Sequence, residues 1–186
     1  MNNTNYILAK NQTLETTRLI LRKIQIEDAP RMFEYASDLD VVEYLTFPVH
    51  QSIEDTEKSI ADFFMPNYLT SWGIVEKSSG KFIGAIDIRL GQKIIAEFGW
   101  VLAKNVLGKG YMPEAAACLR DLCFNELDIK AIISHHDSKN PKSGRVMEKI
   151  GMNHLGQIWA VGKDEQLVLS EYYGLSLEEY KHKMGD

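Results

Sequence analysis

Two glycines flank a lysine at Gly108 and Gly110 of this 186-residue chain, within the stretch NVLGKGYM from Asn105 to Met112. Without a Cβ, the backbone at both positions can take positive φ angles and bring its N–H groups close to a ligand. Pro113 favours the start of a helix directly after them. Because a helix N-terminus offers unpaired N–H donors and the positive end of its macrodipole, this stretch predicts an anion site, most often one for phosphate.

The spacing excludes two familiar phosphate loops. A Walker A loop needs a glycine five residues before the Gly-Lys pair, where this chain has Ala103, and a Ser or Thr after it, where Gly110 stands. The third glycine of a dinucleotide fingerprint would fall at Pro113. A helix-capping loop with two glycines remains the alternative to a phosphate site.

Hydrophobic periodicity predicts the elements that must position this loop. A strand over residues 94–102 leads into it, and a helix follows that buries one face on a sheet. A strand over residues 131–135 comes next, parallel to the first because a β–helix–β unit closes that way. The other predicted elements are strands over 14–24, 71–76 and 81–89, helices over 29–37, 53–64, 141–150 and 177–183, and a hairpin of 155–159 with 166–175.

Composition limits the possible partners. Hydrophobic residues make up 45% and charged residues 25% of the chain, as in a globular protein that folds as one domain over residues 1–186. The net charge of −5 argues against nucleic acid as a partner. We find no spacing of His, Cys, Asp or Glu that suits a metal, and we expect Cys118 and Cys123 to be core thiols.

The polar start of the chain and the absence of a long apolar run complete these expectations. Residues 1–12 are expected to form a flexible leader. They lack the basic and apolar regions of a signal peptide, and no stretch is long enough to cross a bilayer. We therefore expect a cytoplasmic protein without a membrane partner, a monomer or a homodimer.

The pattern Asn105-x-x-Gly108-x-Gly110 after an apolar strand resembles the coenzyme A pyrophosphate loop of the GNAT superfamily of N-acetyltransferases, with Asn105 where most members have Gln or Arg. The string from Glu15 to Arg22, ETTRLILR, followed by Glu27-Asp28-Ala29, is similar to the opening of the RimJ/RimL-type branch. The resemblance extends from Glu15 to Tyr180. It implies an α/β fold with a mixed, strongly twisted sheet, antiparallel in its N-terminal part, with a parallel pair at the cofactor site and flanking helices.

The resemblance also implies acetyl-CoA as cofactor and a set of residues that hold it. Asn140 matches the residue that contacts an amide of the pantetheine arm, and Ser143 lies at the position beside the sulfur. Met147 stands where many members have a tyrosine that protonates the thiolate, so Ser143 becomes the candidate for hydrogen bonding to that thiolate. The expected cofactor-binding residues are Val101, Leu102, Asn105, Leu107, Gly108, Lys109, Gly110, Tyr111, Met112, Asn140, Ser143 and Arg145. If they act only as helix caps, Asn140 and Ser143 need no ligand.

Glu97 is the candidate that accepts the proton of the attacking amine. It shares a strand face with Gly99 and Val101, just before the glycine loop, and AEFGW around it matches the RimJ/RimL-type branch. The alternative is a structural glutamate paired with a lysine. A backbone N–H of Phe98 or Val101 would stabilise the oxyanion, and the sequence leaves that choice open.

The implied reaction is transfer of an acetyl group from acetyl-CoA to a primary amine. Within the RimJ/RimL-type branch the acceptor is often the N-terminal α-amine of a protein, including ribosomal proteins. Relatives also modify small amines such as antibiotics and polyamines. A third hypothesis is a non-catalytic module that binds acyl-CoA. Tyr44, Phe47 and Phe64 are candidates for a wall of the acceptor cleft, if they do not belong to the core.

Overall fold

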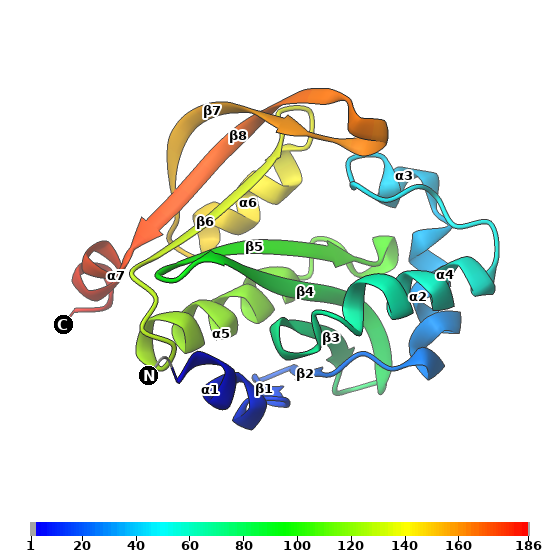
Figure 1. Cartoon of the computed structure of the whole chain (residues 1–186), viewed down its shortest axis with the longest axis horizontal. Coiled ribbons are helices and arrows are strands. Elements are labelled where there is room, and N and C mark those ends of the chain that lie inside the picture. Colours follow the sequence, from blue (N-terminus) through cyan, green and yellow to red (C-terminus); the bar gives the residue numbers. More distant parts are fainter. Residues whose placement is uncertain (1–2, 186) are drawn as a thin grey trace.

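A computed structural model describes residues 3–185, and its centre is one sheet of eight strands with helices on both faces (Figure 1). The strand order is β1-β2-β3-β4-β5-β6-β8-β7, and every neighbouring pair is antiparallel except β5 with β6. The strands are β1 (Leu14–Glu15), β2 (Leu19–Arg22), β3 (Ser71–Glu76), β4 (Lys81–Gln92), β5 (Ile95–Leu102), β6 (Ala131–Asp137), β7 (Asn153–Val161) and β8 (Leu167–Ser176). The expected mixed α/β sheet with one parallel pair is confirmed.

Seven α-helices connect and cover the strands within the described residues. They are α1 (Thr4–Lys10), α2 (Ala29–Ala36), α3 (Leu39–Val42), α4 (Ile53–Ser59), α5 (Tyr111–Asn125), α6 (Pro141–Lys149) and α7 (Leu177–Met184). The predicted capping box starts α4, since Ser52 Oγ accepts from the Asp55 N–H and the Asp55 carboxylate accepts from the Ser52 N–H. A π-helical turn, Ile60–Phe64, continues α4, so the predicted helix does extend to Phe64.

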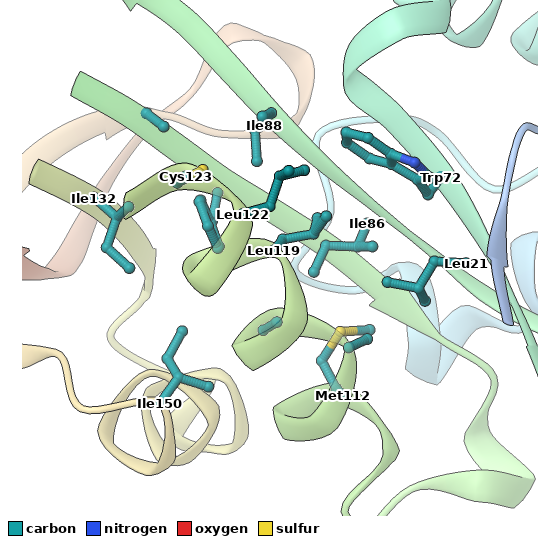
Figure 2. Close-up of a cluster of buried hydrophobic side chains, with 14 of the residues drawn as sticks. Leu21, Trp72, Ile86, Ile88, Met112, Leu119, Leu122, Cys123, Ile132 and Ile150 are labelled. Atoms are coloured by element: carbon teal, nitrogen blue, oxygen red, sulfur yellow. The ribbon is translucent and has the colours of Figure 1, made fainter. Parts of the chain in front are cut away.

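The larger core lies between the sheet and α5. Figure 2 shows Leu119 and Leu122 of α5 facing Ile86 and Ile88 of β4. Cys123 belongs to this core, as expected, whereas Cys118 is only half-buried. Burying such a leucine stabilises the fold by about 1.5–3 kcal/mol, so this face fixes the position of α5 and of the loop before it.

A smaller core covers the opposite face of the sheet. Met32 and Tyr35 of α2 pack there with Phe82 and Ala85 of β4. Phe47 and Phe64, two of the three predicted cleft aromatics, are packed against this core. The structure therefore favours the core role for both of them.

The N-terminal segment differs from the prediction of a flexible leader. Residues 1–2 lie outside the described residues, but residues 4–10 form α1, and the Leu8 side chain is completely buried. Asn11 carbonyl accepts a hydrogen bond from Trp72 Nε1 at 3.0 Å. The Leu8 side chain and the Asn11 carbonyl therefore anchor the segment to the sheet. The mostly polar composition of residues 1–12 gave no sign of this anchoring.

The predicted strand over residues 14–24 is also interrupted. β1 and β2 pair with each other as a tight antiparallel turn, with Leu14 opposite Leu21 and Glu15 opposite Ile20.

Within residues 3–185, no helix is long and apolar enough to span a membrane. No three His, Cys, Asp or Glu side chains of that part of the chain gather as they would around a metal ion.

Candidate active site

The parallel strands β5 and β6 pair only at their beginnings. Ile95 to Glu97 lie opposite Ala131 to Ile133, although β5 continues to Leu102 and β6 to Asp137. At the end of the paired part, Ser134 Oγ donates a hydrogen bond to the Phe98 carbonyl at 2.9 Å. The two strands separate beyond this bond, and the sheet opens between them.

A cleft of about 460 Å³ occupies this opening. Its walls come from both separating strands, the start of α6, residues 43–46 after α3, and residues 161–166 at the turn between β7 and β8. The cleft thus lies where four parts of the chain meet that are distant in sequence, since β6 leads directly into α6.

Residues from both faces of the sheet line this cleft, because successive side chains of β5 point to opposite faces. Phe98 lies on the face covered by α5, while Val101 packs against the smaller core on the other face. Glu97 and Gly99 share the Val101 face, where their β4 neighbours are Arg89 and Asp87. The cleft therefore has a side toward α5 and α6 and a second, charged side.

The separated edge of β5 leaves backbone groups without a strand partner. The Phe98 carbonyl points toward β6, so by alternation the N–H and C=O groups of Trp100 and Leu102 point into the opening. The Val101 carbonyl lies on the β4 side, 2.4 Å from where a Cβ of Gly84 would be. Neither candidate for the oxyanion donor is free. The Val101 N–H lies on the β4 side, and the Phe98 N–H belongs to the last paired position with β6, where Glu97 lies opposite Ile133.

The glycine loop has the backbone conformation that its sequence predicts. Gly108 and Gly110 have φ angles of 79° and 80°, and α5 begins at Tyr111. No described residue accepts a hydrogen bond from the backbone N–H groups of residues 108–112. The side chains of Tyr111 and Met112 are buried in the core, so these two residues can offer a ligand only their backbone groups.

Three further loop residues predicted to bind the cofactor, Asn105, Leu107 and Lys109, are exposed beside these free amides. The loop thus presents unpaired donors at the positive end of a 15-residue helix. A phosphate group fits this arrangement, because its charge and its acceptor oxygens match both features.

The start of α6 contributes the second predicted group of cofactor residues. Asn140 is the N-cap residue of α6, but its side chain makes no capping hydrogen bond. Asn140 Nδ2 instead donates to Ser143 Oγ at 3.3 Å, which leaves the Ser143 hydroxyl proton available to another acceptor. Both residues line the cleft together with the buried Met147, whereas Arg145 is exposed and does not line it.

Glu97 lies on the charged side of the cleft, where its carboxylate is paired with Arg89 and His135. Arg89 Nη1 approaches Glu97 Oε1 at 3.1 Å, and His135 Nε2 approaches the same oxygen at 3.5 Å. The hydrogen bond from His135 and the charge of Arg89 outweigh burial and hold the pKa of the Glu97 carboxyl below its ordinary value. The alternative reading of Glu97 was a structural glutamate paired with a lysine. Its partners in the structure are instead an arginine and a histidine.

Asp87 is a residue that the sequence analysis missed. Its buried carboxylate contacts Arg89 Nε at 3.1 Å, and desolvation raises its pKa to about 6. A Cβ on Gly99 would lie 2.4 Å from Arg89 Nη2 and 2.8 Å from Asp87 Oδ2, so a larger residue at that position of β5 would displace the ends of both charged side chains. The alternation Asp87-x-Arg89 in a predicted strand, facing Glu97 on the next one, is the signal that could have revealed it.

The structure brings four of the predicted site residues, Tyr44, Glu97, Asn140 and Ser143, into one cleft. The other predicted cofactor residues lie outside its lining: residues 101–102 end β5, the glycine loop follows them, and Arg145 is on α6. Because α5 and α6 contact each other and both start after the separating strands, their N-termini flank the same opening.

The sequence matches the family described as the acetyltransferase (GNAT) domain over residues 18–153. The chain belongs to the GNAT acetyltransferase family. It is 29% identical to the uncharacterized N-acetyltransferase YnaD of Bacillus subtilis over 167 residues, which cover 89% of this chain and 97% of YnaD. The family match and the named relatives identify the protein as an acyltransferase.

Solved structures share this fold over most of its length. A GNAT acetyltransferase from Bacillus anthracis aligns with a TM-score of 0.80 and 27% identity, covering 89% of this chain and 99% of its own. A spermidine N-acetyltransferase from Vibrio cholerae, in complex with CoA and spermine, aligns with a TM-score of 0.71 at 17% identity, covering 89% and 99%. The cofactor of the family is acetyl-CoA, and the open edge of β5 and the free loop amides fit its amides and phosphates.

Proposed function

We propose that this GNAT acetyltransferase transfers the acetyl group of acetyl-CoA to the N-terminal α-amine of a protein, as the RimJ/RimL-type branch does. The observation that carries the reaction is the cleft between β5 and β6, which is lined by residues from both faces of the sheet. Cofactor enters from the side of α5 and α6, with its phosphates on the glycine loop and its pantetheine arm along β5. The amine enters from the charged side, where residues 43–46 and 161–166 leave room for a peptide.

In the proposed reaction the neutral amine nitrogen attacks the thioester carbon, and the carbonyl oxygen becomes negative. The donor for this oxygen is a backbone N–H on the separated edge of β5, that of Trp100 or Leu102. The carbon–sulfur bond then breaks, the Ser143 hydroxyl hydrogen-bonds to the departing thiolate, and Glu97 takes the amine proton directly or through water. Ser143 suits this role because Asn140 occupies its oxygen as an acceptor and leaves its proton free.

The first test is the melting temperature with and without excess acetyl-CoA. A ligand at 100 times its dissociation constant stabilises by about 2.7 kcal/mol, which raises Tm by roughly 5–10 °C for a domain of this size. Gly108→Val should abolish the rise, since a branched side chain is strained at φ 79°. Gly80→Val is the matched control, because Gly80 also has positive φ (66°) and open space around it but lies in the β3–β4 turn. Absence of a rise in the wild-type protein would contradict cofactor binding at the loop.

The second test separates the acceptor classes by thiol release from acetyl-CoA. A protein N-terminal acetyltransferase should turn over several peptides with free α-amines and release little thiol with spermidine. Saturation with spermidine and no reaction with peptides would favour the small-amine alternative, which the spermine-bound Vibrio cholerae structure supports by its fold alone.

A third outcome, cofactor binding without thiol release for any amine, would favour a non-catalytic module. In the enzyme, Glu97→Gln should lower kcat/KM at neutral pH while the affinity for CoA stays unchanged. Equal rates for the variant and the wild-type protein would remove Glu97 from the mechanism.

A further inference from the structure

The turn between β1 and β2 contacts the glycine loop, which lies about ninety residues later in the sequence. Arg18 Nη1 donates a hydrogen bond to the Lys109 carbonyl at 2.9 Å. Arg18 Nε forms an ion pair with Glu114, in the first turn of α5, at 2.6 Å. One guanidinium therefore holds both the centre of the loop and the start of the helix that follows it.

Glu114 is bound from the same turn by two more donors. Its Oε1 accepts from Thr16 Oγ1 at 2.6 Å and from the Arg18 backbone N–H at 2.8 Å. These contacts lie at the interruption of the strand predicted over residues 14–24, where Thr16 N–H also donates to the Leu19 carbonyl and closes a local turn. The turn that interrupts the predicted strand is therefore bound to the first turn of α5.

The Arg18 guanidinium is itself confined. It stacks over the Tyr111 ring, with 4.5 Å between its carbon and the ring centroid. The Tyr111 hydroxyl is fixed in turn by a hydrogen bond to Glu76. The arginine is therefore held on the outer side of the loop by ring, carboxylate and carbonyl together.

A planar trans peptide couples the outer contact to the inner surface of the loop. The carbonyl of Lys109 and the N–H of Gly110 belong to the same peptide unit and point in opposite directions. Because Arg18 holds the carbonyl on its own side, the Gly110 N–H faces away from Arg18, as one of the unpaired donors of residues 108–112. The position of Arg18 thus determines the direction of a phosphate-binding donor.

We infer that Arg18 is a positioning residue for cofactor binding, which orients the loop amides toward the diphosphate of CoA through the Lys109 carbonyl and Glu114. The inference rests on the proposed role of the glycine loop. It differs from simple attraction between a cation and phosphate, because it assigns the effect to the fork geometry of the guanidinium.

Two substitutions distinguish geometry from charge. Arg18→Lys keeps the positive charge but cannot hold the Lys109 carbonyl and Glu114 at once. Glu114→Gln removes a negative charge near the loop, which by charge alone would strengthen phosphate binding, yet its amide would place a donor against Arg18 Nε. Positioning predicts weaker binding for both variants, whereas attraction predicts little change for the first and tighter binding for the second.

The experiment measures the dissociation constant of CoA by calorimetry for the wild-type protein and both variants. We expect binding to weaken about tenfold in each variant, which corresponds to about 1.4 kcal/mol. Arg31→Lys is the matched control, since Arg31 pairs with Glu34 on the exposed surface of α2 and should leave the affinity unchanged. Phosphorus NMR of bound CoA adds a readout that lost stability alone would not move: the diphosphate signals should shift in Arg18→Lys, and the 3′-phosphate signal should not.

The outcomes separate the inference from the proposed function. If wild-type protein does not bind CoA, the role of the glycine loop fails, and the inference fails with it. If wild-type protein binds CoA and either Arg18→Lys stays within twofold of it or Glu114→Gln binds more tightly, only the inference is overturned. Should Arg18→Lys fail to fold, Glu114→Gln decides the question alone.

Discussion

Arg89 lies between two carboxylates on the charged side of the cleft, and their pKa values move in opposite directions. Glu97 accepts hydrogen bonds from His135 and Arg89, which lower its pKa, whereas Asp87 is desolvated and its pKa rises to about 6. Glu97 therefore stays ionised through the physiological range, and Asp87 is the carboxyl that titrates closest to it. The two acids differ because one opens to the cleft and the other lies beneath Gly99.

This contrast predicts how stability depends on pH. Because folding raises the pKa of Asp87, its contribution is fully present below pH 4 and is lost as the pH rises through 6. The move from 3.8 to about 6 corresponds to at most about 3 kcal/mol. The free energy of unfolding of Asp87→Asn, relative to wild type, should therefore increase by up to that amount between pH 4 and pH 7 in urea titrations.

Glu97→Gln is the control, because its effect on the free energy of unfolding should change with pH in the opposite direction. The ionised form of Glu97 is the stabilised one, so its contribution is present at neutral pH and disappears as the pH falls through its lowered pKa. The stability of Glu97→Gln relative to wild type should decrease as the pH rises. Parallel pH dependences for the two variants would contradict this account of the charged side.

At the scale of elements, α6 packs against the sheet at a distance that only glycine allows. A Cβ on Gly144 would lie 2.7 Å from His136 Nε2 and 3.1 Å from the Tyr173 hydroxyl. His136 Nδ1 donates to the Asp137 carbonyl, and the buried Nε2 that faces α6 has no hydrogen-bond partner among the described residues. Because Ser143 directly precedes Gly144, the close packing of α6 on His136 and Tyr173 also fixes how far Ser143 lies from the sheet.

Gly144→Ala should therefore push α6 outward. The collision with His136 and Tyr173 should lower the free energy of unfolding by about 1–3 kcal/mol, although alanine favours helix formation more than glycine. Urea denaturation measures this change, and CoA affinity should fall with it. Gly91→Ala is the control, since a Cβ there meets nothing within 4 Å, and we expect a change below about 0.5 kcal/mol. Equal stabilities for both variants would show that α6 tolerates the shift.

The elements whose signals are local were predictable from sequence. The capping box at Ser52 and Asp55 and the glycines of the loop specify helix starts through neighbouring residues, and the strands from 71 to 102 follow from period-two patterns. The interruption of the first strand was not predicted, and its contacts with Glu114 could not be, because Glu114 lies far away in sequence. Glu97 was found through its position before the loop, whereas Asp87 becomes notable only when β4 and β5 pair.

At the scale of the whole molecule, the N-terminal segment belongs to the folded body. Leu8 is completely buried in the larger core, and Trp72 of β3 bonds to the carbonyl just after α1. At the other end of the chain, Tyr180 of α7 stacks on Phe124 of α5, with 4.8 Å between ring centroids. Both terminal helices thus pack against the core that holds α5 and the glycine loop before it.

Leu8→Ala should consequently destabilise the entire fold. Removing a fully buried leucine side chain costs about 2–5 kcal/mol, and the loss should appear as a lower urea midpoint with an unchanged slope. Tyr6→Ala, on the exposed side of the same helix, should change stability by less than about 0.5 kcal/mol. A small effect of Leu8→Ala would mean that α1 is not held in the core.

The composition of the cleft also bears on how this fold diversifies. In the proposed arrangement the cofactor side uses the glycine loop and the start of α6, whereas the acceptor walls are residues 43–46 and the β7–β8 turn at 161–166, both of which line the cleft. Substitutions in these two short connections can therefore accumulate without disturbing cofactor recognition. A lineage built on this scaffold can exchange one amine substrate for another by loop evolution, while the chemistry at the separated strands is inherited unchanged.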